Sequence, residues 1–159
     1  MKLEIELVPS TSWYSNLRKV LTAPEWNKLR EEAYARSNYA CSICGNKGSL
    51  HAHEEWVYDD DQKIQTLDKI VALCENCHML KHAGFSMHTA EGKRKYSTEK
   101  LIIHFCVVNN CSQQDFKLHE NEAFRKFNER SKHNWKFNLE NIAQYGLDPK
   151  EVERKIDAK

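Results

Sequence analysis

Residues 39–84 decide the fold, and they read YACSICGNKGSLHAHEEWVYDDDQKIQTLDKIVALCENCHMLKHAG. A Cys-x-x-Cys pair stands near each end of this segment, Cys41 with Cys44 and Cys74 with Cys77. Two residues between the sulfurs let both thiolates of a pair point to one centre, and Gly45 permits the left-handed turn that such a knuckle often needs. Four thiolates make a closed tetrahedral zinc site with no open position. We therefore predict a structural zinc.

The cysteine pattern has two other interpretations, disulfide bonds and a redox role. A secreted chain with six cysteines would suggest disulfides, but residues 1–8 lack the basic start and apolar run of a signal peptide. We therefore expect a cytoplasmic protein, in which paired cysteines indicate metal. A redox role would need zinc-free sulfurs, and two pairs around one motif favour a zinc clamp. The remaining cysteines, Cys106 and Cys111, are interpreted as a buried thiol and a loop thiol.

Composition predicts one domain over residues 1–159. Apolar residues are 40% and charged residues 30% of the chain, an ordinary mixture for a globular protein. No apolar run approaches the 18 residues of a membrane span, so no membrane partner is expected. The net charge of +1 argues against a large surface that wraps DNA. It does not exclude a small enzyme that binds DNA locally.

Histidines mark a second candidate site between and after the cysteine pairs. Residues 50–56 and 70–73 are expected strands, and a helix is expected to start at His78 and end at Gly84. His78 and His82 lie one helical turn apart, so they share a face and could bind one divalent cation. The alternative is a pair of surface histidines. The predicted order is knuckle, strand, loop, strand, knuckle, helix.

The pattern CxxCG…LxxHExW…ALCxxCHxxKH resembles that of HNH (ββα-metal) endonucleases, most closely the small bacterial and phage proteins. The resemblance implies an α+β fold with residues 39–84 as a zinc-stapled ββα-metal core. Residues 1–38 and 85–159 would then be mainly helical flanks. It also implies hydrolysis of DNA phosphodiester bonds in the cytoplasm of a bacterium or a phage-infected host. A homodimer is possible, because cutting both strands usually needs two active sites.

The resemblance assigns roles to particular residues. His53 matches the general base, which takes a proton from water. His78 and His82 match ligands of a catalytic cation, Mg²⁺ or another divalent ion, which polarises the phosphoryl oxygen. Lys81 could contact phosphate as a point charge.

Two positions depart from the family pattern. Ala52 stands where many members have a metal ligand before the base, and Glu54 or His51 could supply it. We favour Glu54, because hard cations prefer carboxylate oxygen. Asp68 and Lys69 stand near the position where the family has an asparagine, and neither provides an amide. Gln65 could provide that amide from a loop.

The flanks add a candidate nucleic-acid contact. Lys93, Arg94 and Lys95 lie in a polar segment, 85–98, expected to be a loop, where they could neutralise phosphates or be merely solvated. The other expected elements are strands over 2–8 and 135–139, and helices over 13–21, 23–37, 99–109, 113–131, 141–145 and from 149 onward.

The sequence leaves two functions open. The first is the metal-dependent endonuclease. The second is a catalytically inactive zinc-stapled scaffold that binds DNA or protein, favoured by Ala52, by the absent asparagine and by the near-neutral charge.

Overall fold

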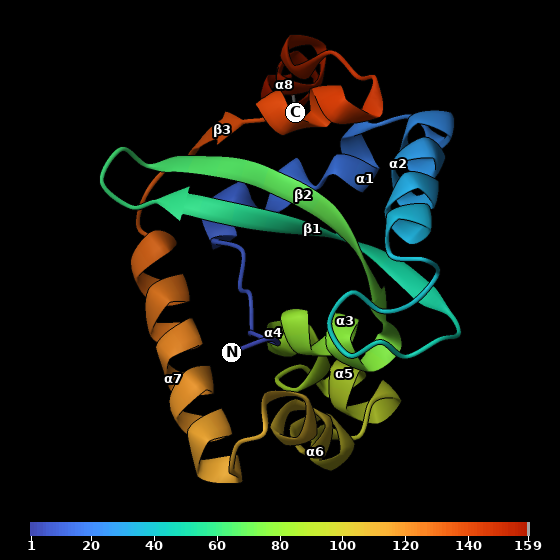
Figure 1. Cartoon of the computed structure of the whole chain (residues 1–159). Coiled ribbons are helices and arrows are strands. Elements are labelled where there is room, and N and C mark those ends of the chain that lie inside the picture. The colour runs from blue at the N-terminus through green and yellow to red at the C-terminus, as the bar shows by residue number, and fades with distance from the viewer. Residues whose placement is uncertain (159) are drawn as a thin grey trace.

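A long antiparallel hairpin crosses the middle of the molecule (Figure 1). The computed structural model describes residues 1–158, except the side chains of residues 14 and 15. Strand β1 (Leu50–Asp59) pairs with β2 (Ile64–Cys74), and the register shifts between Glu55 and Trp56. A short strand, β3 (Lys136–Asn138), adds parallel to β2. The sheet order is β1-β2-β3, so β1 is an edge strand.

Helices precede the hairpin, as expected, but the first residues form no strand. Residues 2–8 are extended, and the side chain of Asn109 takes backbone hydrogen bonds of Lys2 and Leu3 in place of a strand neighbour. The predicted strand is therefore wrong, although its alternation is real, since Leu3 and Ile5 are buried. Next come η1 (Ser10–Ser15), α1 (Leu17–Val20) and α2 (Ala23–Arg36). The capping box of Thr22 and Glu25 confirms the predicted start of α2.

The hairpin leads into a series of helices that ends near the C-terminus. Their bounds are α3 (Glu75–Lys81), α4 (Ala83–Ser86), α5 (Ala90–Lys95), α6 (Thr98–Asn109), α7 (Gln113–Arg130), η2 (Glu140–Tyr145) and α8 (Pro149–Asp157). Helix α3 begins before His78 and ends before Gly84, which corrects its predicted bounds.

The loop predicted over residues 85–98 is also wrong, because this segment contains the end of α4 and the whole of α5. Thr89 caps α5 by accepting a hydrogen bond from the Gly92 N–H at 2.9 Å. Glu91 and Lys95 form an ion pair across one turn at 2.9 Å. A helix this short has no apolar stripe, so its polar sequence looked like a loop.

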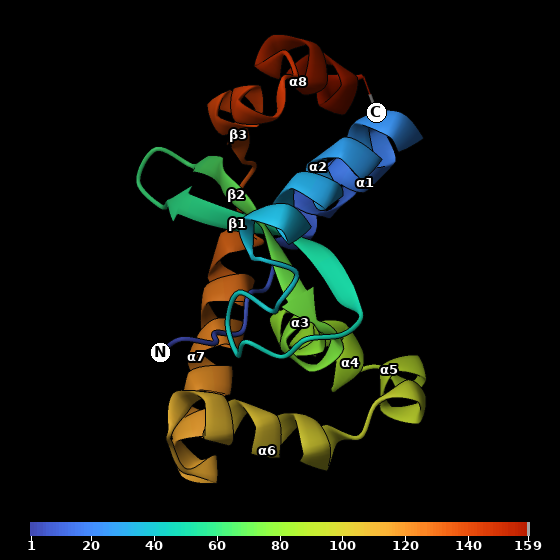
Figure 2. The ribbon, with the colours of Figure 1, turned by 45° about the vertical axis from the view of Figure 1, so that its right-hand side comes forward.

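Helices lie on both sides of the hairpin (Figures 1 and 2), and the buried side chains form two hydrophobic cores. The cysteine-side core includes Leu3, Ile5, Leu73, Leu80, Phe105 and Phe116. The C-terminal core includes Leu17, Leu29, Leu67, Leu139, Ile142, Tyr145 and Val152. Strand β2 contributes to both, so each core holds one part of the hairpin in place. Among the helices described, none has the length and apolar character to cross a membrane.

Candidate metal centres

The four cysteines of the two pairs come together as one cluster. Cys41 and Cys44 lie in the turn before β1, Cys74 ends β2, and Cys77 lies in α3. Their sulfur atoms all lie within 4.8 Å of one another. Gly45 has a φ of 74°, the left-handed conformation predicted for it. This arrangement is compatible with a zinc site.

The electrostatics of the cluster call for a cation. A hydrogen bond from Cys77 lowers the pKa of Cys41 to about 4, against the effect of burial. Burial raises the pKa of Cys74 to about 11, and the hydrogen bond to Cys41, together with burial, raises that of Cys77. The shifts of Cys41, Cys74 and Cys77 therefore oppose the ionisation of these three thiols together. A divalent cation is what would let all four ionise, because metal ligands must be deprotonated.

His104 is a neighbour of this cluster that the sequence did not reveal. Its Nε2 lies 3.2 Å from the Sγ of Cys77. The residue belongs to α6, outside the motif, and no spacing connects it to the cysteines. A ring N–H in this position would stabilise a metal-bound thiolate.

Three histidines form a second cluster. His53 comes from β1, His78 from α3, and His82 directly follows α3. One ligand nitrogen of each lies within 4.8 Å of the others. The ring centroids are 5.5 Å apart for His53 and His78, and 4.7 Å apart for His78 and His82. His51 stacks on His78 at 5.0 Å but does not belong to the group.

The donor set of this second cluster fits a nitrogen-preferring cation. Burial, followed by the neighbouring imidazoles, lowers the pKa of His78 to about 2, and burial lowers that of His82 to about 4. Both rings are thus neutral near pH 7, as metal ligands must be. The Nδ1 of His78 is buried without a hydrogen-bond partner. Imidazoles suit zinc, nickel or copper, whereas Mg²⁺ prefers oxygen, so the cluster favours a transition ion over the expected Mg²⁺.

Glu54 does not join the histidines, contrary to its expected role as a ligand. Strand β1 continues to Asp59, so successive side chains point to opposite faces and Glu54 turns away from His53. Its Oε1 accepts a hydrogen bond from the Leu17 N–H at 3.0 Å. Burial raises the pKa of Glu54 to about 7, against hydrogen bonds from the Leu17 backbone and the Trp56 side chain.

A cleft of about 570 Å³ opens beside the edge strand β1. It is lined by the three clustered histidines and also by Glu54. The other residues that line it are Val8, Ser12, Trp13, Asn16, Arg18, Lys19, Trp26, Ala52, Trp56 and Gln65. Gln65 was expected in a loop but lies on β2, where it is buried and its Oε1 has no hydrogen-bond partner.

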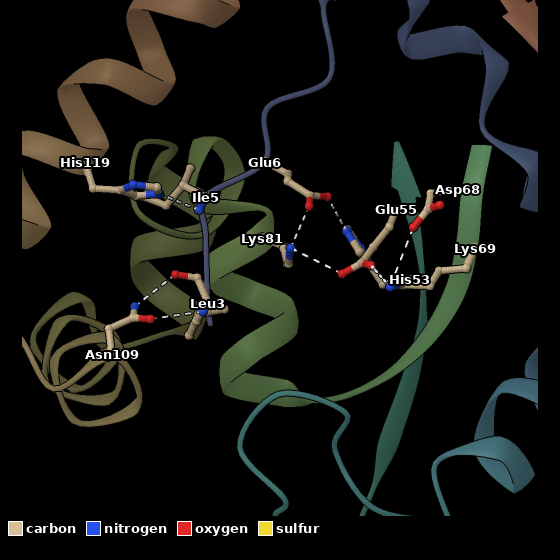
Figure 3. A network of polar contacts seen from close by, with 10 residues as sticks. All are labelled: Leu3, Ile5, Glu6, His53, Glu55, Asp68, Lys69, Lys81, Asn109 and His119. Carbon is tan, nitrogen blue, oxygen red and sulfur yellow. Dashed lines mark hydrogen bonds and ion pairs between the residues drawn. The ribbon is translucent and has the colours of Figure 1, made fainter. Parts of the chain in front are cut away.

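The predicted phosphate contacts lie elsewhere. Lys81 is only 3% exposed, and its Nζ lies 2.6 Å from Glu6 Oε1 and 3.5 Å from Glu55 Oε1 (Figure 3). A lysine held in this way does not face a bound phosphate, so the expected role of Lys81 does not fit its position. Lys93, Arg94 and Lys95 are exposed on α5 and do not line the cleft.

Glu6 is a further residue that the sequence did not reveal. Its Oε2 lies 3.2 Å from the Nε2 of His53 (Figure 3). Burial raises the pKa of Glu6, but the hydrogen bonds from His53 and Lys81 and the charge of Lys81 outweigh it, and the net pKa is lowered. The two residues are 47 positions apart, so no local pattern links them.

Comparison with models of protein families, with curated proteins and with solved structures finds no match to this chain. The cysteine and histidine clusters are therefore interpreted from their own geometry.

Proposed function

We propose that the chain is a metal-dependent endonuclease of the HNH type that hydrolyses DNA phosphodiester bonds. The observation that carries the proposal is the convergence of His53, His78 and His82 in a cleft, within 4.8 Å of one another. The resemblance in sequence covers the same hairpin and helix that supply these histidines. The four cysteines would hold a structural zinc at the base of α3.

The three histidines are the ligands we propose for the catalytic ion. A divalent cation held there would polarise a phosphoryl oxygen and stabilise the leaving oxygen. Such sites commonly have three protein ligands and one open position. His53 was expected to be the base, but a neutral histidine that binds the ion through one nitrogen carries a proton on the other, so it has no free lone pair for that role. Glu54 lies on the face of β1 opposite His53 but also lines the cleft, so we propose that it accepts the proton of a water molecule there without itself binding the ion.

The lining of the cleft supports a nucleic acid as the substrate. Arg18 and Lys19 border it, and cationic side chains neutralise backbone phosphates. Trp13, which also borders it, is 68% exposed, and exposed aromatic rings stack on unpaired bases. Gln65 also lines the cleft, and we propose that its amide takes over the role of the asparagine in the family pattern.

Plasmid cleavage tests the proposal. Purified protein that retains one zinc would be treated with a mild chelator and then supplied with Ni²⁺, Zn²⁺, Mn²⁺ or Mg²⁺. We expect cleavage that needs added metal. The cleavage rate should fall by about 100-fold or more in His78→Ala, because the variant loses a metal ligand. His88→Ala is the matched control, because His88 lies outside the cleft. If folded protein cleaves DNA with none of these metals, the endonuclease proposal is overturned. The alternative, a catalytically inactive scaffold that binds DNA or protein, then remains.

The two roles of His53 separate in the same experiment. If His53 is a ligand, His53→Ala loses both cleavage and the second metal ion. If it is only the base, the variant keeps the ion and loses cleavage. Glu54→Gln is expected to keep the ion and lose cleavage.

A further inference from the structure

We propose that Glu6 is a positioning residue for the histidine centre. In this role it holds the ring of His53 through Nε2 and so prepares that ring to bind the cation. This inference rests on the metal centre of the proposed function. It adds a residue from outside the segment 39–84 that carries the family resemblance.

The contact between Glu6 and His53 has the chemistry of such a role. A carboxylate only accepts hydrogen bonds, so the Glu6 Oε2 at 3.2 Å from His53 Nε2 requires a proton on that nitrogen. In a neutral imidazole the lone pair then belongs to Nδ1, which becomes the nitrogen available to an ion. Carboxylates that hold the second nitrogen of a ligand histidine fix the ring's orientation and raise its basicity.

The chain just before Glu6 is held in place by hydrogen bonds to α6 and α7. The Asn109 side chain accepts hydrogen bonds from the Lys2 and Leu3 N–H groups at 2.9 and 3.0 Å and donates one to the Leu3 carbonyl at 2.9 Å. The Ile5 N–H donates to His119 Nε2 at 2.9 Å. Figure 3 shows the contacts of Leu3 and Ile5 with Asn109 and His119, and it shows Glu6 pointing toward His53.

Lys81 fixes the second oxygen of the same carboxylate. Its Nζ lies 2.6 Å from Glu6 Oε1, which leaves Oε2 for His53. Glu55 lies 3.5 Å from the same Nζ, so the buried lysine retains an anionic neighbour if Glu6 is changed. The replacement of Glu6 therefore does not leave the Lys81 charge without a partner.

Calorimetric titration with Ni²⁺ tests the inference, on full-length protein that keeps its zinc but has had weakly held metal removed. We expect Glu6→Ala to weaken Ni²⁺ binding by about 10- to 100-fold, with Glu6→Gln, which still offers an acceptor oxygen, retaining part of the affinity. Glu4→Ala is the matched control, because Glu4 is exposed on the same segment, and it should bind like the wild type. Equal affinity in all four proteins would overturn the role of Glu6.

A second measurement needs no substitution. Nitrogen NMR of histidine-labelled wild-type protein, with zinc bound and no added Ni²⁺, reports which nitrogen of His53 carries the proton. We expect the Nε2–H tautomer, and the Nδ1–H tautomer would overturn the inference. If His82→Ala loses Ni²⁺ binding but Glu6→Ala does not weaken it, the role of Glu6 is overturned and the metal centre is retained. If the wild-type protein binds no Ni²⁺, the proposed metal centre itself is contradicted.

Discussion

At the scale of single residues, two unpartnered atoms stand out in the described part of the cleft. They are the Nδ1 of His78 and the Oε1 of Gln65, and both are buried. A buried polar atom without a hydrogen bond costs about 1–3 kcal/mol. Such atoms are rare in native proteins and often mark a site that a ligand, water or ion completes. The cleft is thus a place where the fold gives up stability.

Gln65→Met tests this trade of stability for function. Methionine fills a similar volume without a polar atom, so we expect the free energy of unfolding in urea to rise by about 1 kcal/mol. Plasmid cleavage should fall, because the amide is lost from the cleft. Gln62→Met, in the exposed turn between β1 and β2, should change neither quantity. A loss of stability in Gln65→Met would show instead that the amide has a structural partner.

At the scale of elements, the sequence predicted those features that depend on residues close together in the chain. The knuckles and the pairing of His78 with His82 followed from a few residues of sequence. So did the start of α2, which the side chains of Thr22 and Glu25 decide. The contacts of Glu6 and His104 could not be predicted, because they depend on where the extended N-terminal segment and α6 pack. The position of Glu54 was missed because it depends on β1 continuing past Trp56.

The tip of the hairpin is attached to the end of α7 by one arginine. Arg130 donates to both carboxylate oxygens of Asp60, at 2.8 and 2.7 Å. Its guanidinium also lies 4.2 Å from the centre of the Tyr58 ring. The Arg130 carbonyl accepts from Trp135 Nε1 at 2.9 Å. The connection therefore joins β1, α7 and the segment leading to β3.

Arg130→Ala should destabilise the protein by about 1 kcal/mol in urea unfolding, since it removes both a bidentate pair and a cation–π contact. Arg125→Ala is the matched control, because Arg125 makes a similar bidentate pair with Glu122 within one helix and exposed to solvent, so it should change stability much less than Arg130→Ala. Equal losses in the two variants would contradict the special role of the tip.

The Arg130 hydrogen bond lowers the pKa of Asp60 below its ordinary 3.8. The part of the Arg130→Ala effect that comes from the ion pair should therefore be fully present above about pH 4 and be lost as the pH falls through the lowered value, whereas the part that comes from the cation–π contact should remain.

At the scale of the whole molecule, the two cores differ in what supports them. Cys41, Cys74 and Cys77 are part of the cysteine-side core, whereas the C-terminal core contains no member of either metal cluster. A zinc ion in the cysteine cluster would add its binding energy to one core directly. The C-terminal core depends on packing between α1, α2, β2, η2 and α8.

Removal of zinc should therefore loosen the molecule unevenly. We expect amide hydrogen exchange after chelation to rise most in residues 41–44, 71–83 and 101–116. Residues 17–33 and 139–156 should change less. Cys44→Ser should reproduce this pattern without chelator. Exchange that rises equally in both cores would show that the chain unfolds as one unit when zinc leaves.

Helix α3 is the one short element common to both metal clusters. Cys74 directly precedes it, Cys77 and His78 are neighbours within it, and His82 directly follows it. If the proposed function is correct, assembly inside a cell has an order. A newly made chain would acquire zinc first and only then place His78 and His82 to accept the second ion. A chain without zinc would then lack the second metal site as well, so one ion would control whether the other can bind.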